Sequence, residues 1–100
     1  MKVGKKLVGV GVAAAALVLL PVAGALATTV NVGGGLWSYG TTIDTVYSNY
    51  HHGSLYHSAT ACHSGWVDRC HQASASAGAW ANASNAKSPW GGNTAYWNTY

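Results

Sequence analysis

Residues 46 to 51, VYSNYH, alternate in a way that predicts a β-strand with two different faces. One face would carry Val46, Ser48 and Tyr50, and the other Tyr47, Asn49 and His51. β-Branched and aromatic side chains favour strands. The following HHGS contains Gly53, which tolerates a turn conformation, and a second strand-like run extends to Cys62. We therefore expect a β-hairpin over residues 44–62.

The C-terminal part of the sequence predicts further short strands. In AWANASNA, Ala79, Ala81 and Ala83 alternate with larger or polar residues, which favours a strand over a helix. SPWGGN predicts a turn and TAYWNTY a last strand, whereas HQASASA is typical of a linker or loop. Short strands separated by turns indicate an all-β fold, a small antiparallel β-sandwich.

The N-terminus has the layout of a secretory signal peptide. Three lysines precede an apolar run from Leu7 to Leu20, and small residues end the segment at Ala27. The run is shorter than the ~20 residues that span a bilayer, which favours a cleaved leader over an uncleaved membrane anchor. We expect a cleavable helical signal peptide over residues 1–27, cleavage after Ala27, a flexible lead-in over 28–35 and one domain over 36–100. This organisation predicts a secreted, extracellular protein.

Removal of the leader would cancel the fixed charge. The whole chain has a formal charge of +3. After residue 27 it contains two basic residues, Arg69 and Lys87, and two acidic residues, Asp44 and Asp68, so their charges cancel. A basic surface for nucleic acid is therefore not expected. Cys62 and Cys70 favour a disulfide in an exported chain, and closing so short a loop would stabilise the fold by about 2–3 kcal/mol. Whether the pair forms within one chain is left open.

Histidine and tyrosine are concentrated between residues 47 and 57 and invite a chemical interpretation. The five histidines could ligate zinc or copper with the cysteines, but no CxxC or HExxH spacing is present. The more ordinary interpretation is a set of hydrogen-bonded structural histidines. With two Asp and no Glu, and no GxSxG, no catalytic residue, no metal ligand and no cofactor are predicted. Five Trp and six Tyr without any Phe indicate a binding surface, because these rings combine an apolar body with a polar tip.

The block YSNYHHGSLYHSAT resembles the lactococcin 972 family of secreted bacteriocins, which carries YSNYHHG followed by HSAT. Gly35-Leu36-Trp37, AGAWA at 77–81 and the aromatic ending AYWNTY are also similar to that family. The resemblance implies an antibacterial β-sandwich that acts outside the membrane on wall synthesis, with the lipid-linked peptidoglycan precursor as proposed target. The CHSGWVDRC loop and the scarcity of lysine and arginine depart from the family pattern.

The motif match carries over a set of residues for target binding or for building the fold: Trp37, Tyr47, Ser48, Asn49, Tyr50, His51, His52, Gly53, His57, Ser58 and Trp80. The expected partner is a component of the bacterial cell envelope, and the producer's immunity and export proteins are further expected partners. A homodimer stays open. The alternative functions are an exported wall-associated structural or adhesion module and, after it, a histidine-based metal-binding protein.

Overall fold

The computed structural model describes residues 16–19, 26–65 and 69–100, and within these ranges the chain is all-β, with eight strands and no helix. The strands are β1 (Ala16–Leu19), β2 (Leu26–Val32), β3 (Gly35–Thr41), β4 (Thr45–His51), β5 (His57–Cys62), β6 (Cys70–Ala75), β7 (Trp80–Ala86) and β8 (Thr94–Thr99). No helix that could cross a bilayer occurs in the described ranges.

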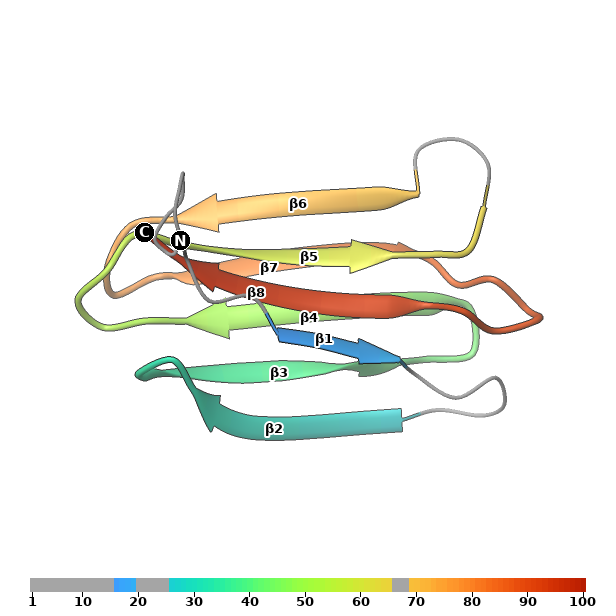
Figure 1. Cartoon of the computed structure of the whole chain (residues 1–100), viewed down its shortest axis with the longest axis horizontal. Helices are drawn as coiled ribbons and strands as arrows, with labels where there is room; N and C mark the ends of the chain where they lie inside the picture. The colour runs from blue at the N-terminus through green and yellow to red at the C-terminus, as the bar shows by residue number, and fades with distance from the viewer. Residues whose placement is uncertain (1–15, 20–25, 66–68) are drawn as a thin grey trace.

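The strands form two antiparallel sheets (Figure 1). Sheet I has the order β1-β8-β5-β6, and sheet II has the order β2-β3-β4-β7. The sheets pack on each other, with β4 and β7 of sheet II in contact with β5 of sheet I, and β6 in contact with β7. The predicted all-β sandwich is therefore confirmed.

The predicted faces of residues 46–51 are also confirmed. Val46, Ser48 and Tyr50 are buried between the sheets, and the alternate residues of β4 are only partly buried. β7 follows the same rule, because Ala81 and Ala83 are buried and their neighbours point outward. Strand geometry explains both patterns, since successive side chains leave opposite faces.

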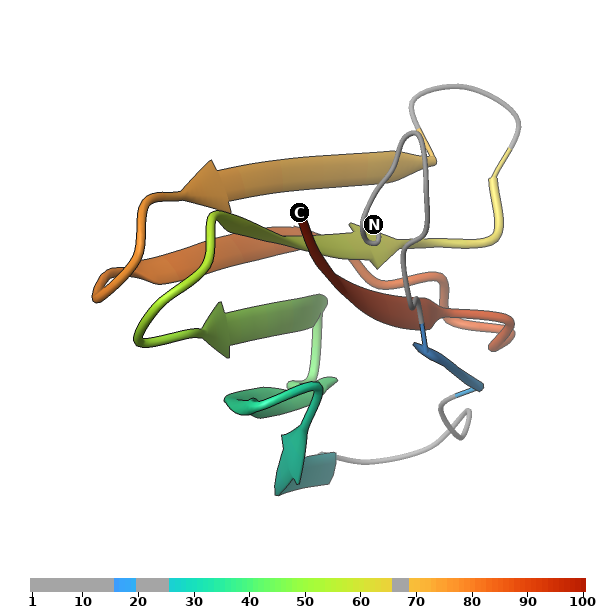
Figure 2. The ribbon, with the colours of Figure 1, turned by 60° about the vertical axis from the view of Figure 1, so that its left-hand side comes forward.

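The predicted hairpin over 44–62 is wrong. β4 pairs with β3 and β7, whereas β5 pairs with β6 and β8, so residues 52–56 cross from one sheet to the other (Figure 2). The crossing lets the apolar face of β4 meet the inward face of β5 across the sandwich, where Ala59 and Ala61 are completely buried. If β4 and β5 paired side by side in one sheet, their apolar faces would no longer pack against each other, and another layer would have to bury them.

The segment HQASASA, predicted as a linker, contributes strand β6 at the edge of sheet I. Its alternating small side chains suit an edge strand, and β6 pairs with β5 in a register that sets Cys62 opposite Cys70. These cysteines form the predicted disulfide. The structure also places residues 28–32 of the expected lead-in in β2, and Gly33 and Gly34 turn the chain into β3 with φ of 62° and 84°.

Ala16–Leu19, expected to be helical as part of the signal peptide, form strand β1 instead. β1 pairs with the outer edge of β8, whose backbone N–H and C=O groups would otherwise lack strand partners on that side. Residues 1–15 and 20–25 of the predicted signal lie outside the described residues. Cleavage after Ala27 would fall within β2 and stays a prediction.

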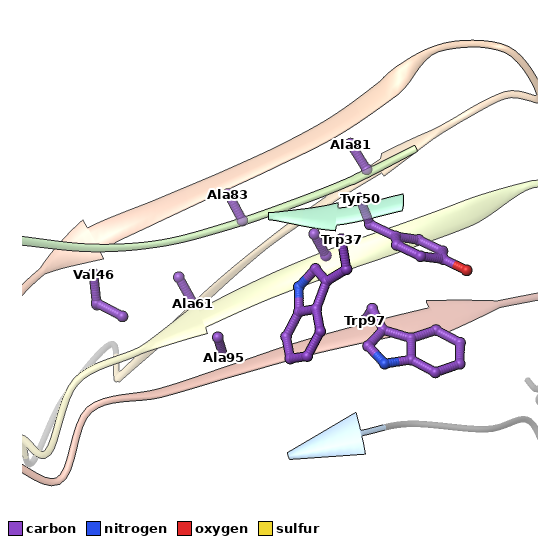
Figure 3. Packing of buried hydrophobic residues seen from close by; sticks show 9 residues of the cluster. Trp37, Val46, Tyr50, Ala61, Ala81, Ala83, Ala95 and Trp97 are labelled. Atoms are coloured by element: carbon purple, nitrogen blue, oxygen red, sulfur yellow. The ribbon is translucent and has the colours of Figure 1, made fainter. Parts of the chain in front are cut away.

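The core combines large rings with small aliphatic residues (Figure 3). Trp37, Tyr50 and Trp97 gather at one end, and the ring centroids of Tyr50 and Trp97 are 5.1 Å apart. Val46 and alanines from both sheets occupy the remainder, the alanines being Ala59, Ala61, Ala81, Ala83 and Ala95. Small side chains let the sheets approach closely, so most of the apolar burial is concentrated in the three rings.

Candidate functional site

The residues that the motif match singled out divide between the inside and the outside of the sandwich. Those that are buried are Trp37, Ser48, Tyr50, His52, His57 and Ser58. Those that are partly buried or exposed are Tyr47, Asn49, His51, Gly53 and Trp80. The alternation of β4 explains the division of its five members of the set, because the even-numbered residues of this strand face the core.

Ser48 joins the two sheets through the core. The indole Nε1 of Trp37 donates a hydrogen bond of 2.8 Å to the Ser48 hydroxyl, which donates one of 2.7 Å to the carbonyl of Tyr96. Trp37 and Ser48 belong to sheet II and Tyr96 to sheet I. The indole N–H and the Ser48 hydroxyl therefore both have hydrogen-bond partners, as buried polar groups in folded proteins nearly always do.

His57 is completely buried, and both of its ring nitrogens face carbonyl oxygens. Nδ1 lies 2.8 Å from the Leu55 oxygen and Nε2 lies 2.8 Å from the Ala79 oxygen. A carbonyl only accepts, so a neutral imidazole can satisfy one of these contacts and an imidazolium can satisfy both. His57 therefore ties the crossing segment to the residue that precedes β7.

His52 has the opposite arrangement. Its Nδ1 accepts hydrogen bonds from the backbone N–H groups of Ser54 and Leu55, at 3.1 and 3.0 Å. Its Nε2 lies 3.2 Å from the Gly33 carbonyl, to which it can donate. These partners select the neutral ring with the proton on Nε2. His52 thus shapes the crossing segment and attaches it to the β2–β3 turn.

Tyr50 lies between these histidines and the core tryptophan. Its hydroxyl donates a hydrogen bond of 2.8 Å to the Val32 carbonyl, and its ring meets His57 edge-on with centroids 5.6 Å apart. Burial raises the pKa of Tyr50 to about 12, because ionisation would place a charge in an apolar environment. Tyr50, His52 and His57 are therefore all engaged in holding the sheets and their connection together.

The outward side of sheet II presents a different surface, which we call the outer face. The registers of β2, β3, β4 and β7 place on it Thr29, Asn31, Leu36, Ser38, Thr45, Tyr47, Asn49, His51, Trp80, Asn82 and Ser84. None of these four strands contains an acidic residue, lysine or arginine. The outer face thus carries no fixed charge on its strands and combines rings with hydroxyl and amide groups.

A pair of rings lies at one end of the outer face. His51 and Trp80 are opposite each other in the β4–β7 register, and their ring centroids are 5.3 Å apart. The His51 Nε2 lies 3.3 Å from the Gly78 carbonyl, and Trp80 remains 44% exposed. Tyr47 opposes Ser84 farther along the same strand pair. The arrangement offers stacking surfaces next to hydrogen-bonding groups.

The sequence predicted four residues of the outer face, Tyr47, Asn49, His51 and Trp80, but did not indicate the polar residues beside Asn49. Ser38 opposes Asn49 in the register, and Asn82 opposes Asn49 from the other side, so the three form a row across the sheet. The signal for Asn82 was present in the alternation of AWANASNA. The register that aligns these residues depends on long-range pairing, which a local pattern does not reveal.

The described residues do not gather into a metal-binding cluster. No group of three or more His, Cys, Asp or Glu that could hold a metal ion occurs among them. Cys62 and Cys70 are joined to each other, and the Asp44 carboxylate accepts hydrogen bonds from the hydroxyls of Thr42 and Thr45. The histidines of the central block are engaged with backbone groups instead.

Comparison with known proteins supplies the family. No curated protein and no solved structure matches the chain. The sequence model of the lactococcin 972 bacteriocins, in contrast, matches residues 33–97, a range that includes the central block, strands β3 to β7 and the first four residues of β8. The chain therefore belongs to the lactococcin 972 family of bacteriocins, which are antibacterial proteins directed at other bacterial cells.

Proposed function

We propose that this bacteriocin is secreted, binds a component of the bacterial cell envelope through its outer face and blocks wall or septum synthesis without catalysing a reaction. The lipid-linked peptidoglycan precursor is the target that the family resemblance suggests. The observation that supports binding by the outer face is its composition, a row of hydroxyl and amide groups beside exposed rings on strands that carry no acidic residue, lysine or arginine.

This composition suits the sugar and peptide groups of a wall precursor. A sugar ring has an apolar C–H face that can stack on Trp80 or Tyr47, and its hydroxyls and amides can bond with side chains such as Asn49 and Asn82. Each amide side chain both donates and accepts, so it can match either kind of group. The flat outer surface of a sheet can reach a target fixed in the envelope without enclosing it.

The inner half of the motif is excluded from direct contact by its burial. Tyr50 and His57 have no exposed surface, and their polar atoms already have partners. Their contribution to function would be indirect, through the stability of the sandwich. Of the motif residues, we therefore assign contact with the target to Tyr47, Asn49 and His51, together with Trp80.

A pair of tryptophan substitutions tests the proposal. Trp80 is 44% exposed on the outer face, whereas Trp90 is 71% exposed in the loop before β8. We expect Trp80→Ala to weaken retention on vesicles that contain the purified wall precursor by at least tenfold, because a sugar ring loses its stacking partner, and a nucleic-acid base that loses such a partner loses about 1–3 kcal/mol. Growth inhibition of sensitive strains should fall in parallel. Trp90→Ala should keep vesicle retention and growth inhibition within twofold of the values for the unchanged protein.

Two outcomes would contradict the proposal. If both variants bind and inhibit like the unchanged protein, the outer face is not the contact surface. If the unchanged protein binds wall material but never inhibits growth, the chain is better described as a wall-associated adhesion module, the alternative that the sequence left open. Far-ultraviolet circular dichroism of each variant confirms that the sandwich is intact in these comparisons.

A further inference from the structure

A cavity at the disulfide end of sheet I has a chemistry different from that of the outer face. It has a volume of about 260 Å³, and the described residues that line it are Cys62, His63, Ser64, Arg69, Cys70, Gly92, Thr94 and Tyr96. The volume is below that of a typical pocket for a drug-sized ligand, so the cavity suits a small group. It lies between the β5–β6 and β7–β8 connections, on the sheet opposite the outer face.

A network of hydrogen bonds joins the two connections around this cavity. Ser64 receives support from both sides, because its N–H donates to the Ser88 hydroxyl at 3.0 Å and its own hydroxyl donates to the Gly91 carbonyl. The buried Asn93 in turn exchanges hydrogen bonds with the backbone of Ser88, at 2.8 and 3.2 Å. A Cβ on Gly92 would lie 2.8 Å from that of Ser64, so only glycine permits this close approach.

The base of the Arg69 side chain is fixed in the same way. The Arg69 carbonyl accepts hydrogen bonds from the His63 N–H at 2.8 Å and from the Asn85 side-chain amide at 3.0 Å. The neighbouring Cys70 is joined to Cys62 on the opposite strand. The cavity is therefore built from residues whose backbones are held in place before any ligand arrives.

The cavity lining is rich in hydrogen-bond donors and carries positive charge. Arg69 contributes a guanidinium, His63 an imidazole, and Thr94 and Tyr96 hydroxyl groups, whereas no acidic residue is among the described lining. No ion pair joins Arg69 to another residue of the described ranges, and the Asp44 carboxylate is engaged by Thr42 and Thr45. A guanidinium and an imidazole at a small cavity, beside hydroxyl-bearing residues and with no acidic residue in the described lining, form an arrangement that suits an oxyanion.

We propose that this cavity binds a phosphate or diphosphate group through Arg69, His63, Thr94 and Tyr96. A phosphate group has three or more oxygens that point in different directions, and donor-bearing side chains line this cavity from the β5–β6 connection and from β8. A carboxylate has only two oxygens and would leave several donors unused. The site is separate from the outer face, and the inference does not depend on the proposed function.

Titration of the full chain with inorganic diphosphate, at constant ionic strength, tests the site. We expect saturable binding that Arg69→Gln weakens by at least tenfold, and that Arg69→Lys weakens less, because the charge stays while the two-pronged geometry is lost. Lys87→Gln is the matched control, since it removes the same charge outside the cavity lining, and it should change affinity less than twofold. Amide signals of Thr94 and Tyr96 should shift in nuclear magnetic resonance spectra during the titration.

Two results would overturn the inference. Absence of saturable diphosphate binding to the unchanged protein would remove the site, and equal weakening by Arg69→Gln and Lys87→Gln would reduce it to general charge attraction. Vesicles with a polyprenyl diphosphate, compared with vesicles of phosphatidylglycerol, then identify the source of the group. Retention only on the polyprenyl diphosphate vesicles indicates a lipid-linked diphosphate as the ligand. Binding of free diphosphate without retention on either kind of vesicle indicates a soluble ligand. Trp80→Ala should leave diphosphate binding unchanged, so this test and that of the outer face can fail separately.

Discussion

Replacing His57 with alanine tests the interpretation that the buried half of the motif builds the fold. The side chain has no exposed surface, and its nitrogens lie 2.8 Å from the carbonyl oxygens of Leu55 and Ala79. Removing the ring takes a hydrogen-bonding partner from this partly buried connection, at a cost of about 1–3 kcal/mol. The packing against Tyr50 is lost as well. We expect a decrease of about 3–5 kcal/mol in the free energy of unfolding.

Such a loss is a large part of the stability of a small domain, which is about 5–15 kcal/mol. Urea unfolding followed by tryptophan fluorescence measures it through the transition midpoint. His71→Ala is the matched control, because His71 is exposed on the edge strand β6 and should change stability by no more than about 0.5 kcal/mol. If His57→Ala unfolds at the same urea concentration as His71→Ala, the structural role assigned to the ring is refuted.

The tautomer of the buried His52 ring gives the same interpretation a second readout. In nitrogen-15 spectra we expect the His52 proton on Nε2, which faces the Gly33 carbonyl, because Nδ1 accepts two backbone N–H groups. A proton on Nδ1 of His52 would contradict the contacts that shape the crossing segment.

Three further predictions concern the rest of the sandwich. Because burial raises the pKa of Tyr50 to about 12 and the unfolded chain ionises near 10, the stability that this residue contributes is complete below pH 10 and is lost as pH rises toward 12. Tyr50→Phe should flatten this part of the pH profile of the urea midpoint, and an unchanged slope would contradict the assignment. Replacing both Cys62 and Cys70 with serine should lower stability by about 2–3 kcal/mol and the melting temperature by about 10–20 °C, and an equal melting temperature would show that the short loop contributes nothing. A chain that starts at Thr28 lacks β1, which pairs Ala16 with Trp97, so the emission of its tryptophans should shift to longer wavelength; an identical spectrum would mean that β1 does not cover this edge.

Much of the fold could be predicted from local patterns, because each strand face has its own composition. The alternation in VYSNYH and in AWANASNA correctly divided inward from outward residues. The disulfide followed from two cysteines in a chain with an export signal pattern. These features depend on period-two geometry and on cysteine chemistry, which a sequence expresses directly.

The features that could not be predicted depend on contacts between distant residues. HHGS looked like a hairpin turn, but His52 is bonded to Gly33 and His57 to Ala79, and these contacts direct the chain into the other sheet. The segment HQASASA has no clear alternation of apolar and polar residues. It forms β6 because its backbone pairs with the free edge of β5. Strand formation of this kind is decided by the partner, so propensity alone gives the wrong answer.

The candidate site shows how one motif can carry two roles. In β4 the even positions, such as Tyr50, bond within the core, and the odd positions, such as Tyr47, face outward. A chemically identical pair of substitutions, Tyr50→Ala and Tyr47→Ala, therefore separates the roles. Loss of growth inhibition through Tyr50→Ala should come with a lower melting temperature, because a buried ring and its hydrogen bond are removed. Loss through Tyr47→Ala should come with a smaller change in melting temperature, because that ring is only partly buried and lies outside the core. If Tyr47→Ala keeps full activity, the outer end of β4 does not touch the target, and recognition must lie elsewhere on the sandwich.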